Sequence, residues 1–280
     1  MKIIALMLLI LMCTAISCGF LHPKREQKAH KLPATLEKTS ACFILYDLKK
    51  EKVVEVINED RCNKRFPACS TFKIPLAVMA FDQGILRGPN SSPYEWDGKK
   101  RMILTWNKNH TGKTWMQDSV VWFSQRMTKD MGRKKIQGYL DKFNYGNRDF
   151  SGGIEDAWLT PAPFLEKPPK TTVMISAMEQ IEFMKALYLY RLPVSLNAMT
   201  MTQNLLPSET SQRGSVLTGK TGSGFVGEGS RRRLGWFVAN VKSGTDEYLS
   251  VLSFDDNEPG FGGNLAKESM KQILLEKGLW

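Results

Sequence analysis

The stretch Pro67-Ala68-Cys69-Ser70-Thr71-Phe72-Lys73-Ile74-Pro75-Leu76 places a serine and a lysine three residues apart at the expected start of a helix. Residues three apart share one helix face, so the Lys73 amine should lie beside the Ser70 hydroxyl. Burial among apolar neighbours would lower the pKa of this lysine, and a neutral amine can take the serine proton. The stretch therefore predicts an acyl-transfer nucleophile at Ser70, which also caps the helix, with Lys73 as its base.

A second motif, Lys220-Thr221-Gly222, falls on a predicted strand late in the chain. Such a strand would supply a cation and a hydroxyl for a substrate carboxylate, and the Ser223 N–H for an oxyanion. S-x-x-K followed by K-T-G is typical of β-lactamases and penicillin-binding proteins. The two motifs together indicate serine acyl transfer far more specifically than S-x-x-K alone.

Several other chemistries are disfavoured by the sequence. Its three histidines are His22, His30 and His110, so a Ser-His-Asp triad or a zinc site would depend on His110 alone. Residues 214–221 fit the P-loop pattern, but polar residues precede them and a glycine-rich segment follows, where that loop needs a strand and a helix. Ser195-Leu196-Asn197 imitates an S-x-N motif, and we interpret it as chance. No metal site is expected.

The composition is that of a globular protein, with 42% hydrophobic and 24% charged residues. The formal net charge of +11 would suit nucleic acid, an anionic surface or an anionic small substrate. We find no basic stripe interleaved with aromatics, so nucleic acid is not expected. The densest basic run, Arg231-Arg232-Arg233, is interpreted as a solvated hairpin turn.

The first 19 residues have the pattern of a secretory signal: Lys2, about ten apolar residues, then small residues from Thr14 to Gly19. The apolar stretch is too short for a good membrane span. Either a peptidase cuts near Ser17 or Gly19, or Cys18 is lipidated; we favour cleavage without lipid. We expect a flexible leader over 20–38, a catalytic domain over 39–280, and a periplasmic or secreted location.

Three cysteines remain outside the signal region: Cys42, Cys62 and Cys69. An odd number cannot all be paired. A Cys62–Cys69 bridge would suit an oxidising compartment, and two buried free thiols are an equal alternative.

Hydrophobic periodicity predicts strands over 42–47 and 52–57, an irregular stretch over 88–112, and three later strands over 215–221, 234–241 and 248–254. It predicts helices over 114–127, 133–143, 176–190 and 265–275. The fold class is therefore α/β, in α+β layers: an antiparallel sheet built from both chain ends, flanking helices, and an inserted helical lobe.

Five segments resemble class D (oxacillinase-type) serine β-lactamases, in the family's order and approximate spacing. They are Pro67–Leu76, Ser119-Val120-Val121, Tyr145-Gly146-Asn147, Trp158 and Lys220-Thr221-Gly222. The resemblance runs from about Cys42 to Leu275. It implies the β-lactamase and penicillin-binding-protein transpeptidase-like fold, and hydrolysis of penicillin-type β-lactams, giving antibiotic resistance.

The resemblance also implies roles for individual residues. Ser70 attacks the lactam carbonyl, and the N–H groups of Ser70 and Ser223 hold the oxyanion. Lys73 reacts with CO2 to form a carbamate (N6-carboxylysine), the base for both half-reactions. No other cofactor is implied. The remaining roles are a hydrogen bond to the carbamate from Trp158, proton relay by Ser119 and Lys220, and substrate contacts from Val121, Thr221, Gly222 and Lys267.

One position departs from the family, which often has an arginine near the last helix for the substrate carboxylate. Lys267 aligns there, and Thr221, Lys220 or Arg233 are alternatives for this contact. Two other functions share most of these motifs: a β-lactam-sensing receptor domain that stays acylated, and a D,D-peptidase of the penicillin-binding-protein type. The Tyr145-Gly146-Asn147 segment is interpreted as a structural turn.

Overall fold

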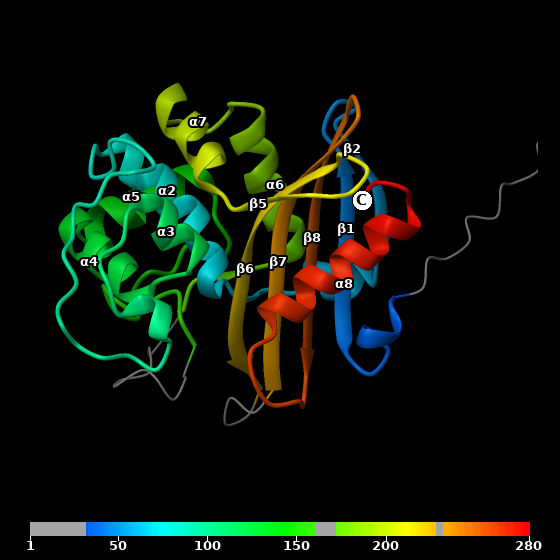
Figure 1. The fold of residues 1–280 in the computed structure, drawn as a ribbon, viewed down its shortest axis with the longest axis horizontal. Helices are drawn as coiled ribbons and strands as arrows, with labels where there is room; N and C mark the ends of the chain where they lie inside the picture. Colours follow the sequence, from blue (N-terminus) through cyan, green and yellow to red (C-terminus); the bar gives the residue numbers. More distant parts are fainter. Residues whose placement is uncertain (1–31, 161–171, 228–231) are drawn as a thin grey trace, which may run out of the picture. The chain divides into compact units, whose positions relative to one another are not determined.

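Strands from both ends of the chain meet in one antiparallel sheet, as predicted. The computed structural model describes residues 32–160, 172–227 and 232–280. Its six-stranded sheet has the order β2-β1-β8-β7-β6-β5 (Figure 1). The strands are β1 (Ser40–Asp47), β2 (Lys52–Ile57), β5 (Ser208–Thr210), β6 (Val216–Val226), β7 (Arg232–Ser243) and β8 (Asp246–Asp256). All five strands predicted from period-two patterns are present, and the short β5 of this sheet was missed.

Each face of the sheet is covered by a different set of helices. The C-terminal helix α8 (Gly263–Glu276) lies across one face (Figure 1), where Met270 and Ile273 pack against Phe43, Phe237 and other buried side chains. Trp236, Val238 and Val251 of the opposite face belong to the larger core of the helical lobe. Both faces of the sheet are buried in this way because side chains alternate between the two faces along each strand.

The helical lobe is inserted between the two groups of strands. It contains α1 (Glu59–Asn63), η2 (Cys69–Phe72), α2 (Lys73–Asp82), η3 (Leu104–Trp106), α3 (Gly112–Gln117), α4 (Val121–Met131), α5 (Arg133–Phe143), α6 (Ala177–Tyr188) and α7 (Leu196–Leu205). A two-stranded sheet pairs β3 (Phe66–Pro67) with β4 (Met174–Ile175). The helix predicted over 133–143 is α5, whereas the one predicted over 114–127 is two helices, because Ser119 adopts φ 56° between α3 and α4.

The predicted leader is partly built into the fold. Residues 34–36 form a 3-10 turn (η1, Ala34–Leu36), and Leu36 is fully buried in the core beneath α8. The flexible leader predicted over 20–38 is therefore wrong for this last part. The predicted signal segment 1–19, including Cys18, lies outside the described residues. Within the described ranges, no helix has the length and apolar character needed to cross a membrane.

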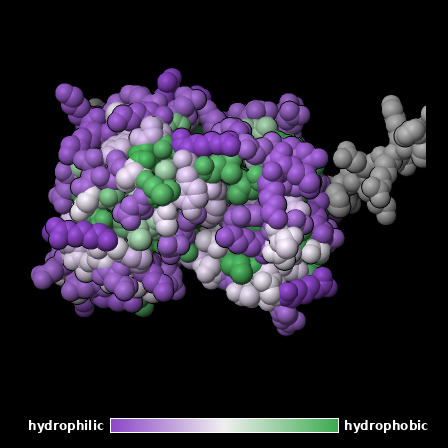
Figure 2. Space-filling view, turned by 90° about the horizontal axis from the view of Figure 1, so that it is seen from above, coloured by the Kyte–Doolittle hydropathy of each residue, from purple (hydrophilic) through white to green (hydrophobic). Residues whose placement is uncertain are grey.

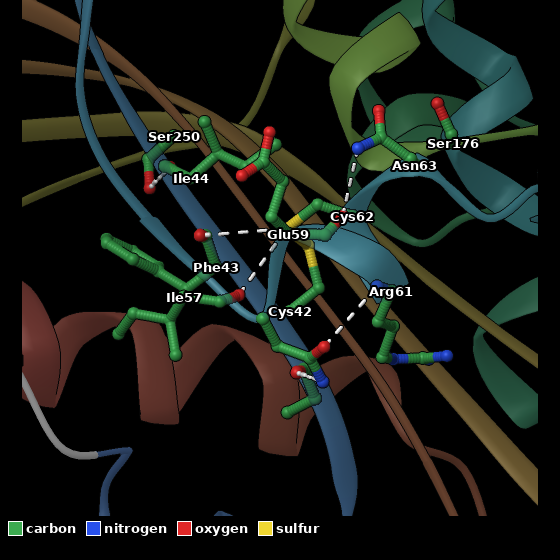
Figure 3. Close-up of a disulfide and its surroundings, with 12 residues drawn as sticks. Cys42, Phe43, Ile44, Ile57, Glu59, Arg61, Cys62, Asn63, Ser176 and Ser250 are labelled. Atoms are coloured by element: carbon green, nitrogen blue, oxygen red, sulfur yellow. Dashed lines mark hydrogen bonds between the residues drawn. A yellow bond between two sulfur atoms is a disulfide. The ribbon is translucent and has the colours of Figure 1, made fainter.

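One disulfide ties strand β1 to helix α1. Cys42 and Cys62 are bonded, with their Cα atoms 5.3 Å apart (Figure 3), while Cys69 is a buried free thiol. The predicted Cys62–Cys69 bridge is therefore wrong, and the alternative of two buried free thiols holds for Cys69 but not for Cys62. The pairing depends on the approach of β1 to α1, which sequence spacing does not reveal.

Two of the three arginines in the predicted basic run do not lie in a solvated turn. Arg232 and Arg233 lie in β7 and form ion pairs with Asp255 and Asp256 of the neighbouring strand, at 2.5 Å each. Arg231 lies outside the described residues. Because the arginines of β7 lie opposite aspartates of β8, these cross-strand ion pairs hold the arginine side chains in place.

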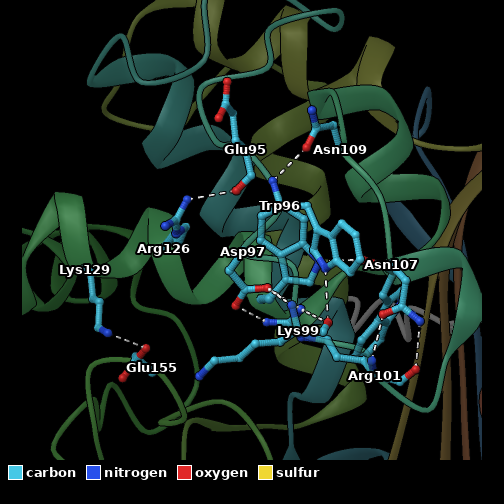
Figure 4. Close-up of polar contacts among 12 residues, drawn as sticks. Glu95, Trp96, Asp97, Lys99, Arg101, Asn107, Asn109, Arg126, Lys129 and Glu155 are labelled. Atoms are coloured by element: carbon cyan, nitrogen blue, oxygen red, sulfur yellow. Dashed lines mark hydrogen bonds and ion pairs between the residues drawn. The ribbon is translucent and has the colours of Figure 1, made fainter.

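The segment 88–112 is irregular, as predicted, but it is held by its own side chains. The Arg101 guanidinium bonds to Asp97 at 2.8 and 2.9 Å, and the Trp96 N–H donates to Asn109 at 2.7 Å (Figure 4). The molecular surface seen from above is mainly hydrophilic, with apolar side chains in separate patches (Figure 2).

Candidate active site

The serine and lysine of the first motif lie in contact at the start of the helical lobe. The Lys73 Nζ donates a hydrogen bond of 3.2 Å to the Ser70 Oγ. Ser70 lies in η2, a 3-10 turn that leads directly into α2 at Lys73. The predicted helix cap is wrong, because the Ser70 side chain caps neither helix and accepts from the lysine instead.

Lys73 is completely buried within the apolar core. Burial lowers its pKa well below the usual value for lysine, and the neighbouring positive charge of Lys220 lowers the pKa further. Desolvation disfavours the ammonium, so the neutral amine is the favoured form. A neutral amine at hydrogen-bonding distance from a serine hydroxyl can accept its proton.

Strand β6 carries the second motif to the same place. A Cβ on Gly222 would lie 3.0 Å from the Thr71 side chain, so the strand passes directly against the nucleophile turn. Lys220 is 2% exposed, and burial lowers its pKa to about 7. Its Nζ donates to the Thr221 carbonyl oxygen at 2.9 Å. The site therefore contains two buried lysines, and burial lowers the pKa of both.

The edge of β6 that faces away from β7 has two N–H groups available for a ligand. At this edge the Gly219 N–H donates to the Pro207 carbonyl oxygen at 2.9 Å, and the Phe225 N–H donates to Thr160 Oγ1 at 3.0 Å. Alternate residues of a strand direct their N–H groups to the same edge, so those of Thr221 and Ser223 point there too. Strand β5 pairs only with Val216–Thr218. The Ser223 N–H therefore points into the space beside the nucleophile turn.

Ser119 and Val121 lie at the junction of α3 and α4, close in the chain to a residue that lines a pocket beside β6. Ser119 has a left-handed φ of 56°, a strained conformation of the kind found at functional sites. It lies two residues after Gln117, which lines a pocket of about 130 Å³ together with Lys220 and Thr221. Val121 is the first residue of α4 and is nearly buried. The structure thus brings Gln117, at the end of α3, to the strand that carries the lysine motif.

Lys267 lines the same pocket from helix α8, but its charge is already paired. Its Nζ lies 2.7 Å from Glu209 of β5, which also binds Lys271. Arg233 does not line the pocket, and both its Nε and Nη2 bond to Asp256. Of the candidates for a carboxylate contact, Lys220, Thr221 and Lys267 are at the pocket, and Arg233 is not.

Trp158 packs against the nucleophile turn from the other side. Its ring stacks on Phe72 with centroids 5.6 Å apart, and its carbonyl oxygen accepts the Cys69 N–H at 3.0 Å. The buried indole N–H has no hydrogen-bond partner among the described residues. A buried indole N–H normally has a partner, so this donor is available to an acceptor group beside the nucleophile turn.

The Tyr145-Gly146-Asn147 segment has an architectural role in the structure. Gly146 has φ 56°, and a Cβ there would collide with the backbone of Met174. The Asn147 side chain accepts from the Met174 N–H at 3.0 Å, and the Tyr145 ring packs edge-on against Phe72.

No cluster of three or more His, Cys, Asp or Glu within residues 32–160, 172–227 and 232–280 could hold a metal.

Some residues at the site carry no motif and were missed. Thr160 bonds to β6, Gln117 lines the pocket, and Glu209 pairs with Lys267. None has a sequence signal, because each is recruited by tertiary packing. Cys69 has φ 50° immediately before the nucleophile, a conformation that its sequence does not suggest.

This arrangement defines a serine acyl-transfer site of the penicillin-recognising kind. The model of the penicillin binding protein transpeptidase domain matches residues 41–275. Among solved structures, a class D beta-lactamase from Bacillus subtilis is similar with a TM-score of 0.77 and 30% identity, covering 89% of this chain and 96% of the other. The C-terminal domain of the Bacillus licheniformis BlaR penicillin-receptor is similar with a TM-score of 0.76 and 26% identity, covering 87% and 92%.

Relatives in sequence show to which family of penicillin-recognising proteins the chain belongs. Beta-lactamase OXA-1 of Escherichia coli is 36% identical over 237 residues, which is 82% of this chain and 80% of that protein. The probable beta-lactamase YbxI of Bacillus subtilis is 32% identical over 241 residues, covering 86% and 82%. The chain belongs to the class D β-lactamase family, within the penicillin-binding transpeptidase fold.

Proposed function

We propose that this chain hydrolyses the β-lactam ring of penicillin-type antibiotics through an acyl-enzyme on Ser70. The observation that carries the proposal is the contact between Ser70 and a buried, weakly basic Lys73, opposite Lys220 of β6. The names of the relatives support it, since OXA-1 and YbxI are beta-lactamases. Such hydrolysis would protect a cell against these antibiotics.

In acylation, the Ser70 oxygen bonds to the lactam carbonyl carbon while its proton passes to the base at Lys73. The N–H groups of Ser70 and Ser223 stabilise the oxyanion. The carbon–nitrogen bond then breaks, and the departing nitrogen takes that proton, relayed from Lys73 through Ser119 and Lys220. In deacylation, water adds to the ester carbonyl carbon while one of its protons passes to the base at Lys73. The bond to the Ser70 oxygen then breaks, and this proton passes from Lys73 to that oxygen.

We also propose that Lys73 carries CO2 as a carbamate in the active enzyme. When bound, this group supplies an anionic base at the end of the lysine side chain. The neutral, buried Lys73 amine is the form that reacts with CO2, and the unpartnered Trp158 indole N–H would hold the carboxylate oxygen. Phe72 and the Trp158 ring limit the access of water to this group.

The N-terminal segment supports export. Lys2, the apolar residues after it and the small residues up to Gly19 match a secretory signal. We therefore propose a periplasmic or secreted enzyme, the compartment in which the Cys42–Cys62 disulfide would persist.

A β-lactam sensor is the main alternative, because the BlaR receptor domain shares this fold. A chromogenic cephalosporin, assayed with and without added bicarbonate, separates the functions. A hydrolase turns over many equivalents and responds to bicarbonate, whereas a sensor consumes one equivalent and stops. A D,D-peptidase would instead release D-alanine from a D-alanyl-D-alanine peptide. A single stoichiometric burst from the purified chain would refute the hydrolase proposal.

A further inference from the structure

The short segment Trp158–Thr160 contacts both sides of the proposed oxyanion site. At one end, the Trp158 carbonyl oxygen accepts the Cys69 N–H at 3.0 Å, immediately before the nucleophile. At the other end, Thr160 Oγ1 accepts the Phe225 N–H at 3.0 Å, two residues beyond Ser223. Three consecutive residues therefore connect the nucleophile turn to the strand opposite it.

Close packing supports this connection. Thr160 is 5% exposed, and a Cβ on Gly224 would lie 2.8 Å from its Oγ1 and closer still to the Cys69 Sγ. The missing side chain at Gly224 thus provides the space in which Thr160 and Cys69 meet β6. Because this space is filled, the strand cannot move toward the turn.

The bond to Phe225 also fixes the N–H that matters for catalysis. The N–H groups of Ser223 and Phe225 point to the same edge of β6, one two-residue repeat of roughly 7 Å apart. The hydrogen bond that holds the Phe225 N–H therefore also fixes the position and direction of the Ser223 N–H. An oxyanion site depends on donors held at hydrogen-bonding distance from the developing charge, and small displacements reduce the rate.

We propose that Thr160 is a positioning residue for the oxyanion site: its hydroxyl oxygen holds the end of β6 so that the Ser223 N–H faces the Ser70 N–H. The proposal rests on the acyl-transfer function proposed above. Thr160 itself does not touch the reacting atoms. The Thr160 side chain acts through the backbone of β6.

Thr160→Val tests this role, because valine keeps the shape of threonine and lacks the acceptor oxygen. Acylation by a chromogenic cephalosporin should slow by about 10- to 100-fold, a part of the effect of losing one oxyanion donor. The affinity for a boronic acid, whose tetrahedral adduct on Ser70 occupies the oxyanion site, should fall by the same factor. Thr160→Ser, which keeps the oxygen, should stay within about threefold of the parent protein in both measurements.

Thr202→Val is the matched control. Thr202 is also buried, and its hydroxyl donates to the Ala198 carbonyl oxygen at 2.8 Å within α7, a helix that carries none of the proposed site residues. Its removal should lower the melting temperature without changing acylation or boronate affinity. If Thr160→Val does not fold, Thr160→Ala compared with Thr160→Ser gives the same contrast.

Parent-like acylation by Thr160→Val would overturn the positioning role, as would a rate loss without a loss of boronate affinity. An equal loss in Thr160→Ser would overturn it too, since the oxygen would then be irrelevant. A parent protein that forms no acyl-enzyme at all would refute the proposed function itself, whatever the Thr160 variants do.

Discussion

Lys73 and Lys220 are two buried lysines, and the surroundings of each suit a different proposed task. Burial and the charge of Lys220 together lower the pKa of Lys73 far below the usual value. Burial alone lowers the pKa of Lys220 to about 7, and its ammonium is bonded to the Thr221 carbonyl oxygen. One lysine is therefore suited to accept a proton and the other to carry a charge near neutral pH.

This difference predicts a bell-shaped pH profile of kcat/KM for carboxylate-bearing lactams. Lowering the pH protonates Lys73 and removes the base, while raising it through about 7 removes the charge of Lys220. Lys220→Arg keeps a cation at every working pH, so the alkaline limb should disappear even if the absolute rate is lower. An alkaline limb that is unchanged in Lys220→Arg would assign it to another group.

Glu209 should weaken the attraction of the pocket for anions. Its pKa is lowered by Lys267 and Lys271, so it is ionised at neutral pH. Glu209→Gln removes this negative charge and should lower KM for a carboxylate-bearing lactam by roughly threefold to tenfold at low salt, with little change in kcat. The difference should shrink in high salt. A raised KM would show instead that Glu209 orients Lys267 for the carboxylate.

At the scale of elements, β6 determines the site because its glycines permit two close approaches. Gly222 allows contact with Thr71, and Gly224 allows contact with Cys69 and Thr160. The strand thus presents unpaired N–H groups beside the nucleophile along an edge that β5 leaves open.

Gly224→Ala should therefore separate β6 from the nucleophile turn. The added methyl group would overlap Cys69 and Thr160, at a cost of about 1–3 kcal/mol in the free energy of unfolding and a large loss of kcat/KM. Gly138→Ala is the control: a Cβ there meets nothing within 4 Å in helix α5, and alanine should stabilise the fold by about 0.5–1 kcal/mol. Chemical denaturation and steady-state kinetics measure both effects. A fully active Gly224→Ala would refute the close-approach argument.

The elements that were predicted correctly are those whose signal is local. Period-two alternation predicted β1, β2, β6, β7 and β8, and the S-x-x-K spacing predicted the contact between Ser70 and Lys73. The break at Ser119 was missed because a non-glycine residue takes φ 56° there, which local propensity disfavours. Helix α7 was missed although Ser195 caps it, because the Ser195-Leu196-Asn197 triplet was interpreted only as a chance match to a catalytic motif. Thr160 and Glu209 act through contacts that only the folded chain creates.

At the scale of the whole molecule, the disulfide joins β1 and α1, which carry none of the proposed site residues, and should serve stability. It closes a separation of 20 residues between β1 and α1. Replacing Cys42 and Cys62 by alanine together should lower the free energy of unfolding by about 2–5 kcal/mol. At 25 °C, kcat/KM should be unchanged. Equilibrium denaturation of the double variant, with Cys69 intact in both proteins, gives the comparison, and a change below about 1 kcal/mol would contradict it.

The central claim is that Lys73, buried and neutral, takes up CO2 and serves as the base for Ser70. Trp158→Phe keeps an aromatic ring to pack on Phe72, but it is smaller than the indole and lacks the indole N–H. The variant should therefore bind CO2 more weakly and deacylate about 10²–10⁴-fold more slowly without added bicarbonate.

The most direct measurement is carbon-13 NMR of the protein in labelled bicarbonate, recorded with turnover across pH. The account predicts a carbamate signal in the parent protein that is absent in Lys73→Ala and weakened in Trp158→Phe. It should disappear at low pH together with activity, and both should return on adding bicarbonate at neutral pH. Full turnover in CO2-free buffer without a carbamate signal would contradict the account.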